Sequence, residues 1–344
     1  MTRPSSSRKL LLPLVPAYRL ALLLRELGLR TGMEQVSRLH FPVVSVGNLS
    51  AGGAGKTPLT IVLAKALDAR GLRVDVLSRG YGRRGQRPAR VDPDGTAEDF
   101  GDEPLLIARE TGVPVFVAGQ RLGAGQLAEA YAPLDVAGPN SPAVHILDDG
   151  FQHRQLHRDV DILLLDHRDW LGEGLLPAGN LREPRKAARR ATIIAIPAPD
   201  KAPELEAALR KWGWEGPVWR LHRRMDVPPI DGPVAAFCGI ARPEQFFAGL
   251  EAVGQRIAAR VAFPDHHRFT PADVHRLVDT AKKTGATALI TTEKDLVRIG
   301  SLASAFPESL RLKTALLRIE IEHESEAIDW LVDFLESTRQ NAPL

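Results

Sequence analysis

The sequence has little cysteine, little net charge and no long hydrophobic run. A single cysteine, Cys238, among 344 residues excludes a disulfide framework and any metal site built from several cysteines, and it fits a reducing compartment. The formal net charge is only +3, so attraction to phosphate or anionic lipid must come from local basic clusters. The apolar stretch 10–24 is interrupted by Pro13, Pro16 and Arg19, and it is shorter than the roughly 20 residues of a spanning helix. We therefore expect neither an export signal nor a spanning helix there.

Apolar runs rich in β-branched residues alternate with helical stretches along much of the chain. In the first part, the expected strands cover 41–47, 72–80, 113–119, 143–150, 160–166 and 191–197. Continuous apolar runs with helices between them indicate strands that are buried on both faces of a mostly parallel sheet. The expected fold class is therefore α/β, and ligands of such sheets bind at the carboxyl ends of the strands.

The length of 344 residues suggests about two domains. A stretch with several Pro and Trp residues, 212–234, interrupts the alternation before an α/β pattern restarts, so we place a boundary near residue 225. Strands near 217–223 and 314–321 are expected to pair as a linker between the domains, and a closing helix is expected to start at Ser325. The predicted parts are an N-terminal helix (1–30), a larger domain (31–225), a smaller α/β domain (226–313) and a returning strand with the closing helix (314–344).

The stretch VGNLSAGGAGKTP (46–58) ends in the Gly-Lys-Thr of a loop that holds nucleotide phosphates. The usual pattern, G-x-x-x-x-G-K-[ST], has glycine where this chain has Ser50. A strand precedes the stretch and a helix follows, which is the context that such a loop requires. Its backbone N–H groups are expected to close on phosphate oxygens, with Lys56 reaching the β and γ phosphates and Thr57 offering a magnesium ligand. The residues expected around the nucleotide are Gly52, Gly53, Ala54, Gly55, Lys56 and Thr57.

The base of the nucleotide is indicated more weakly. Guanine is usually read by an Asn-Lys-x-Asp pattern, and TTEKD (291–295) has a different spacing. The sequence therefore favours ATP.

Two pairs of acidic residues are each open to a functional and a purely structural interpretation. Asp148 and Asp149 come at the end of an apolar strand, where this class of protein places a second magnesium contact; the alternative is an Asp-Gly turn, and beside a phosphate loop we favour the metal. Asp102 and Glu103 stand just before Pro104 and a helix. Acidic residues are favoured at helix N-termini, so capping alone would explain this second pair.

Basic clusters lie at 78–85 and 180–190. Arginine forks suit phosphate, so clusters near a nucleotide loop suggest an anionic substrate or a membrane surface, and a solvated basic face is the alternative. Aromatic stacking residues do not interleave with them, which argues against nucleic acid. In FPDHHRF (263–269), adjacent histidines are poorly placed to share one metal, which leaves a surface turn or a single catalytic imidazole.

Residues 16–30 form an amphipathic pattern. Arg19, Glu26 and Arg30 lie on one face of the predicted helix, and leucines cover much of the rest. Such a helix either packs on the protein's own core or lies in a membrane surface with its arginines at the headgroups. The pattern by itself leaves both possibilities open.

Seven motifs occur together in this chain: VGNLSAGGAGKTP, LSRGYGR, GDEP, DDGFQH, LLPAGNLREP, FPDHH and TTEKD. Their order closely resembles that of the tetraacyldisaccharide 4'-kinase family, the lipid A 4'-kinases of Gram-negative bacteria, from the N-terminal helix to at least residue 298. The resemblance implies a P-loop NTPase-like domain with a second, smaller α/β domain. It also implies transfer of the ATP γ-phosphoryl group to the 4'-hydroxyl of a lipid-linked disaccharide 1-phosphate at the cytoplasmic face of the inner membrane. Ser50 then fits, because the family's loop is written around GGxGKTP.

The resemblance assigns roles to residues. Lys56 and Thr57 hold phosphate and magnesium, and Asp102 is the proposed base with His266 as its partner, although His267 directly follows. The remaining implied metal ligands are Asp148, Asp149 and Glu103, and the implied substrate-binding residues are Arg79, Gln152, Asn180 and Arg182. The resemblance replaces the interpretation of Asp102 as a helix cap and favours a peripheral membrane role for the N-terminal helix. The expected cofactors are ATP and Mg²⁺.

A nucleotide-driven, membrane-associated switch ATPase is the competing class of protein. Its loop also contains GGxGKT after a strand. Such loops usually carry a lysine just before the paired glycines, where this chain has Ala51. That difference counts against a switch.

Overall fold

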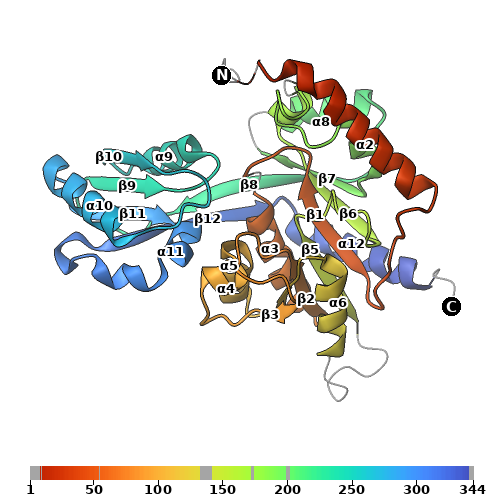
Figure 1. The fold of residues 1–344 in the computed structure, drawn as a ribbon, viewed down its shortest axis with the longest axis horizontal. Helices are drawn as coiled ribbons and strands as arrows, with labels where there is room; N and C mark the ends of the chain where they lie inside the picture. Colours follow the sequence, from red (N-terminus) through yellow and green to blue (C-terminus); the bar gives the residue numbers. More distant parts are fainter. Residues whose placement is uncertain are drawn as a thin grey trace.

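The computed structural model describes residues 8, 10–53, 55–131, 142–171, 174–198 and 202–340. Within them, twelve strands form one sheet in the order β10-β9-β11-β12-β8-β7-β6-β1-β5-β2-β4-β3. Helices cover both faces of the larger half of this sheet, and the smaller half extends away from it (Figure 1). The architecture is therefore mixed α/β.

Six parallel strands form the larger half, where six apolar runs predicted them. They are β1 (Val43–Asn48), β2 (Arg73–Ser78), β4 (Val115–Val117), β5 (Ala143–Asp148), β6 (Val160–Leu164) and β7 (Ile193–Pro197). The short β3 (Ala89–Arg90) pairs with β4 in the antiparallel sense at one edge. β1 lies between β5 and β6, with Val46 opposite Asp148 and Ile162. The end of β1 and the end of β5 therefore meet at one edge of the sheet.

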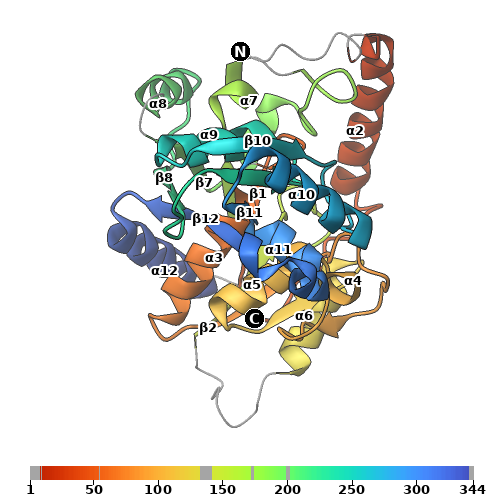
Figure 2. The same ribbon diagram turned by 90° about the vertical axis from the view of Figure 1, so that its left-hand side faces the viewer.

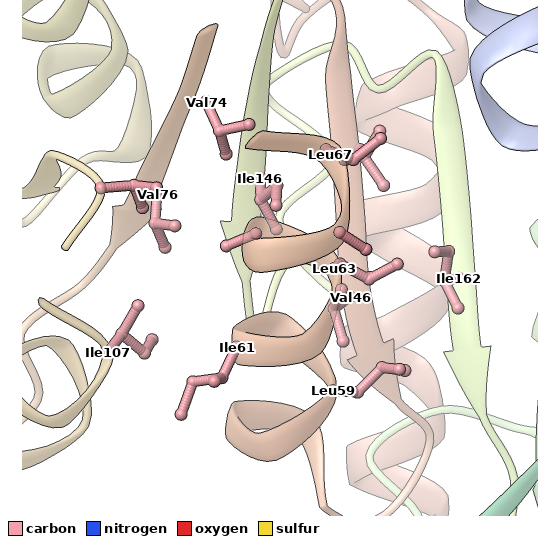
Figure 3. Packing of buried hydrophobic residues seen from close by; sticks show 14 of the residues in the cluster. Val46, Leu59, Ile61, Leu63, Leu67, Val74, Val76, Ile107, Ile146 and Ile162 are labelled. Carbon is pink, nitrogen blue, oxygen red and sulfur yellow. The ribbon is translucent and has the colours of Figure 1, made fainter. Parts of the chain in front are cut away.

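The helices of this half begin after the strands and pack on the sheet. They are α3 (Lys56–Asp68), α4 (Ala97–Phe100), α5 (Asp102–Thr111), α6 (Arg121–Ala130), α7 (His167–Leu171), α8 (Ala202–Lys211) and the 3₁₀ helix η2 (Arg185–Arg190). Leu59, Leu63 and Leu67 recur every fourth residue on α3, so they share one face. That face is fully buried against strand residues that include Val46 and Ile162 (Figure 3). This packing fixes the start of α3 over the end of β1.

The smaller half repeats the α/β pattern. It contains β9 (Val234–Cys238), β10 (Ile257–Ala262), β11 (Ala288–Thr292), α9 (Pro243–Ala252), α10 (Pro271–Thr284), α11 (Glu293–Ile299), η3 (Gly300–Ala305) and η4 (Glu308–Leu310). The three strands run parallel, and Phe237 lies at the centre of their apolar core with Phe263, Phe269 and Phe306 around it. Figure 2 shows this half in front of the larger one.

Two long strands connect the halves. β8 (Val218–Asp226) pairs with β7 and β12 (Leu312–Ile321) pairs with β11, and the two pair with each other in the antiparallel sense, with Arg223 opposite Ile319. The predicted pairing of 217–223 with 314–321 is thus confirmed. The boundaries that the sequence suggested near 225 and 313 fall inside these strands, and the division into domains stays a prediction.

The ends of the chain add two helices. α2 (Val15–Arg30) follows the 3₁₀ turn η1 (Leu12–Leu14), and α12 (Glu324–Gln340) begins one residue before Ser325, where the sequence predicted it to start. α2 lies along the outside of the larger half (Figure 1). Among the residues described, there is no helix that is both long enough and apolar enough to span a membrane.

The N-terminal helix has two different sides, and the core packing that the sequence offered as one alternative is present on one of them. Val15, Tyr18 and Leu22 of α2 pack against a buried cluster that contains Leu49, Phe151 and Trp170 of the larger half. The opposite side carries leucines that are more than half exposed, namely Leu20, Leu23, Leu24 and Leu27. One face of the helix therefore belongs to the core, and the other presents apolar surface to the outside.

Candidate active site

The phosphate loop (50–57) connects β1 to α3, as the sequence predicted. Gly52 and Gly55 have φ of 103° and 92°, which glycine adopts without strain, and Gly55 is the N-cap of α3. A side-chain carbon on Gly52 would stand 3.5 Å from the Ala241 methyl, and one on Gly55 would stand 3.4 Å from the Arg223 guanidinium. The loop therefore faces residues of both halves of the molecule. Ala54, expected in the same set, lies outside the described residues.

Lys56 is held at the first turn of α3. Its Nζ donates to Asn48 Oδ1 at 3.1 Å and stands 3.5 Å from Asp149 Oδ1. Its side chain is 10 % exposed, and Thr57 beside it is buried. The lysine and the threonine thus occupy the helix N-terminus that the phosphate loop prepares for an anion.

Three carboxylates lie near this lysine, and their pKa values are shifted in different directions. Burial, with further repulsion from Glu103 and Asp149, raises the pKa of Asp148 to about 7. Burial alone would also raise the pKa of Asp149, but Lys56 and Arg182 beside it hold that pKa below its usual value. Glu103 forms an ion pair with Lys294, which lowers its pKa against the effect of burial. The site thus concentrates negative charge around Asp148.

This distribution of charge fits a divalent cation. Within the described ranges, no three His, Cys, Asp or Glu side chains are grouped so as to hold a metal by themselves. Magnesium needs only one or two carboxylates, because it keeps several waters and takes its other ligands from substrate phosphates. A cation at Asp148 would relieve the repulsion that raises the pKa of this residue. The residues present therefore suit Mg²⁺ brought in with a nucleotide.

Asp102 and His266, which are far apart in the sequence, meet between the two halves. Asp102 is the first residue of α5 and is 4 % exposed; His266, after β10, has φ of 56° and places Nδ1 3.0 Å from Asp102 Oδ2. Among the described residues, Asp102 Oδ1 accepts from the neighbouring Glu103 N–H alone, at 3.0 Å, so Asp102 does not cap the helix across its first turn. His267 instead contacts Asp273 at 3.0 Å in its own half of the molecule. The geometry thus distinguishes the two adjacent histidines.

Arg298 on α11 completes this cluster. Its Nε donates to Asp102 Oδ2 at 2.6 Å, and its Nη1 donates to Asp295 Oδ1 at 2.9 Å. Burial would raise the pKa of Asp102, but the hydrogen bond from His266 and the charge of Arg298 hold it far below its usual value. The same hydrogen bond raises the pKa of His266. At neutral pH, Asp102 is therefore an oriented anion.

Three of the residues expected to bind substrate contact the phosphate loop or the strand ends beside it. Arg182 Nη1 donates to both oxygens of Asp149 at 3.0 Å and to Gln152 Oε1 at 3.2 Å. Gln152 Nε2 donates to the Asn48 carbonyl at 2.9 Å, and the Asn180 carbonyl accepts from Ala51 N at 2.7 Å. These three predicted residues are thus brought together with the nucleotide loop.

Arg79 follows β2 and is exposed. Its charge affects the nearby Arg121: burial lowers the pKa of Arg121, Asp149 raises it, and Arg79 lowers it further. Arg79 therefore lies within electrostatic range of the site, in contrast to the direct contacts of Arg182.

The sequence reasoning missed two arginines and a lysine of the site. Arg121 begins α6 directly after β4, and the rule that ligands bind at strand ends would have found it. Arg298 and Lys294 belong to the segment that starts with TTEKD, which was considered only for guanine recognition and as a family motif. Their contacts join segments almost two hundred residues apart, and no local pattern signals them.

Comparison with known proteins shows the family to which this chain is similar. Residues 7–336 match the family described as "Tetraacyldisaccharide-1-P 4'-kinase". The chain belongs to this family. A tetraacyldisaccharide 4'-kinase of Koribacter versatilis is 38 % identical over 310 residues, which cover 87 % of this chain and 90 % of the relative. A tetraacyldisaccharide 4'-kinase of Chromobacterium violaceum is 36 % identical over 337 residues, with 95 % and 94 % covered.

A solved structure of the tetraacyldisaccharide 4'-kinase family agrees with the fold. The crystal structure of LpxK from Aquifex aeolicus, an "apo" form in complex with ATP, superposes with a TM-score of 0.71 at 31 % sequence identity. The match covers 95 % of this chain and 99 % of that one. The expected fold class, family and enzyme class, a lipid kinase, are thereby confirmed, and a switch ATPase is not favoured.

Proposed function

We propose that this chain transfers the γ-phosphoryl group of ATP to the 4'-hydroxyl of a tetraacyldisaccharide 1-phosphate in lipid A biosynthesis, at the cytoplasmic face of the inner membrane. Membership of the kinase family carries the proposal. The arrangement of the site supports it, because Glu103, which directly follows Asp102 of the Asp102–His266 pair, is close enough to Lys56 of the phosphate loop for their charges to interact. The ATP in the Aquifex aeolicus structure supports ATP as the donor.

Phosphoryl transfer depends on positioning and on neutralising charge around the γ-phosphoryl group. The backbone N–H groups of the phosphate loop and Lys56 would bind the β and γ phosphates. Thr57 and Asp148 would hold Mg²⁺, which neutralises charge between those phosphates, and Asp149 would orient Lys56. These roles follow from the residues at the carboxyl ends of β1 and β5.

Asp102 is the residue best placed to receive the hydroxyl proton. Its low pKa makes it a weak base. A weak base suffices here, because the hydroxyl proton leaves late in a loose transition state. His266 and Arg298 hold one carboxylate oxygen, Oδ2, and so fix the direction of the other. In this proposal, the pair acts as one unit that orients and accepts, as a general base does.

The acceptor lipid would approach from the side of α2. The Tyr18 hydroxyl donates to the Arg182 carbonyl at 2.8 Å, and the Arg25 guanidinium donates to the Gln152 carbonyl. The helix with the exposed leucines is thus hydrogen-bonded to the segments that carry the predicted substrate-binding residues. A lipid held at the bilayer surface by that apolar face would present its sugar close to the phosphate loop.

Mass spectrometry tests the proposal. The purified chain is incubated with ATP, Mg²⁺ and a synthetic tetraacyldisaccharide 1-phosphate, with Lys56→Ala as the matched control. We expect a product heavier by one phosphoryl group with the wild type and a greatly reduced yield with the variant. The proposal would be contradicted if the lipid stayed unmodified after incubation of the wild type with ATP and Mg²⁺, or if both proteins gave the same yield of product.

A further inference from the structure

Ser50 stands where the usual phosphate loop has glycine, and its side chain makes two hydrogen bonds in the structure. Its backbone does not adopt the positive φ that would require glycine. Its side chain is fully buried: Oγ donates to Asp169 Oδ2 at 3.1 Å and accepts from Asn48 Nδ2 at 3.1 Å. The serine is thus a hydrogen-bonded link, which a glycine cannot be.

The link continues to the catalytic lysine. Asn48 receives Lys56 Nζ on its Oδ1 at 3.1 Å and donates through its Nδ2 to Ser50. The three hydrogen bonds follow one another in a single direction. The ammonium donates to the amide oxygen, the amide nitrogen donates to the hydroxyl oxygen, and the hydroxyl donates to the carboxylate of Asp169. This order agrees with what each group can donate or accept, and it fixes the orientation of the Asn48 amide.

Asp169 provides the fixed end. It lies on α7 and is 1 % exposed, and Asn48 and Ser50 are fully buried as well. A buried polar network is rigid only when all its members are satisfied, because removing one member leaves its neighbours unpaired in a medium of low dielectric constant. A substitution at Asp169 or Ser50 should therefore alter the position of the Lys56 ammonium, because Asn48 connects them.

We propose that Asp169 and Ser50 are positioning residues, which act through Asn48 to hold the Lys56 ammonium where the transferring phosphoryl group develops charge. The proposal rests on the phosphate-binding role of Lys56 given above. Interactions that matter mainly in the transition state lower kcat when they are lost, whereas ground-state binding of ATP also has the backbone N–H groups of the loop. Loss of the link should therefore lower kcat much more than it raises KM for ATP.

The decisive variant is Ser50→Gly, which restores the usual phosphate-loop pattern. We expect kcat to fall about tenfold, the loss that one hydrogen bond to a charged network supports, and KM for ATP to change by less than about twofold. Ser45→Ala is the matched control, because Ser45 is a fully buried serine of β1 whose Oγ has no hydrogen-bond partner in the described part of the chain. It should keep the wild-type kcat.

A double-mutant cycle separates positioning from loop packing. Asp169→Leu alone and Ser50→Gly/Asp169→Leu together should have kcat values close to that of Ser50→Gly, because all three variants lack the same hydrogen-bonded link. Wild-type kcat in Ser50→Gly, or equal changes in kcat and KM for ATP, would overturn the proposal. If Asp169→Leu does not fold, Ser50→Gly still tests the proposal.

The same experiment keeps the two proposals apart. Lys56→Ala is measured beside the other variants. An active Lys56→Ala would refute the assignment of the phosphate site itself. An inactive Lys56→Ala combined with a fully active Ser50→Gly would refute only the positioning link.

Discussion

Replacing Arg298 by methionine should destabilise the protein in a way that depends on pH. Arg298 and Asp102 have side chains that are only 6 % and 5 % exposed, and the arginine belongs to the smaller half while the aspartate belongs to the larger one. At an effective dielectric constant of about 20, unit charges about 3 Å apart attract by about 5 kcal/mol. Methionine retains much of the apolar stem but removes this charge.

The expected loss at pH 7 is about 3–5 kcal/mol of the free energy of unfolding, the usual cost of removing one partner of a buried pair. His266 keeps its hydrogen bond to Asp102, which places the expectation toward the lower end. The sign with pH follows from the lowered pKa of Asp102. The stability that its ionised form contributes is present above the unfolded pKa near ~3.9 and is lost as the pH falls. The difference between wild type and variant should therefore shrink below about pH 4.

Urea unfolding followed by tryptophan fluorescence at pH 7 and at about pH 3, below the unfolded pKa of Asp102, measures this difference. Arg224→Met is the control, because the Arg224–Asp226 pair is exposed (63 % and 39 %) and, like most surface ion pairs, should contribute little to stability. If Arg298→Met cost no more than the control at pH 7, or cost as much at about pH 3 as at pH 7, the buried-pair account of Asp102 would be wrong.

Three further predictions concern catalysis and membrane contact. Lys56→Ala and Asp149→Ala should keep the fold, measured by circular dichroism, but lose most ATP-dependent transfer; wild-type turnover in both would rule out the site. Asp102→Ala/His266→Ala should be little worse in kcat than the poorer single variant, since the two share one role, whereas losses that multiply would mean independent roles. Deleting 1–30 should lower binding to anionic vesicles and raise KM for the lipid more than KM for ATP; unchanged partitioning of a stable truncated protein would show that the helix only packs on the core.

The sequence predicted the sheet well because the signal was local. An uninterrupted apolar run of β-branched residues is typical of a strand that is buried on both faces of a sheet. Each of the six runs forms a parallel strand. The phosphate loop was equally readable, since the strand, the glycines and the helix that form it are consecutive in the chain. Ser50 was noticed as a departure from the pattern, but its partner Asp169 is 119 residues away and could not be inferred.

The Asp102–His266 pair could not be predicted from the local sequence. The residues around Asp102 alone predicted a helix cap, and only the resemblance to a family suggested a base with a histidine partner. The pair spans 164 residues and depends on how β8 and β12 bring the two halves of the molecule together. Arg298, which together with His266 lowers the pKa of Asp102, was missed for the same reason, because its role lies in a contact between the halves and not in its local sequence.

The central claim is that the γ-phosphoryl group passes to a sugar hydroxyl and not to water. The most direct measurement follows ADP release and lipid phosphorylation together, with phosphorus–proton correlation NMR locating the new phosphate on the disaccharide. The account predicts one new phosphate monoester at the 4' position for each ADP formed, and little ADP without the lipid. ADP released with inorganic phosphate at the same rate with or without the lipid would contradict the account and favour a nucleotide-driven switch.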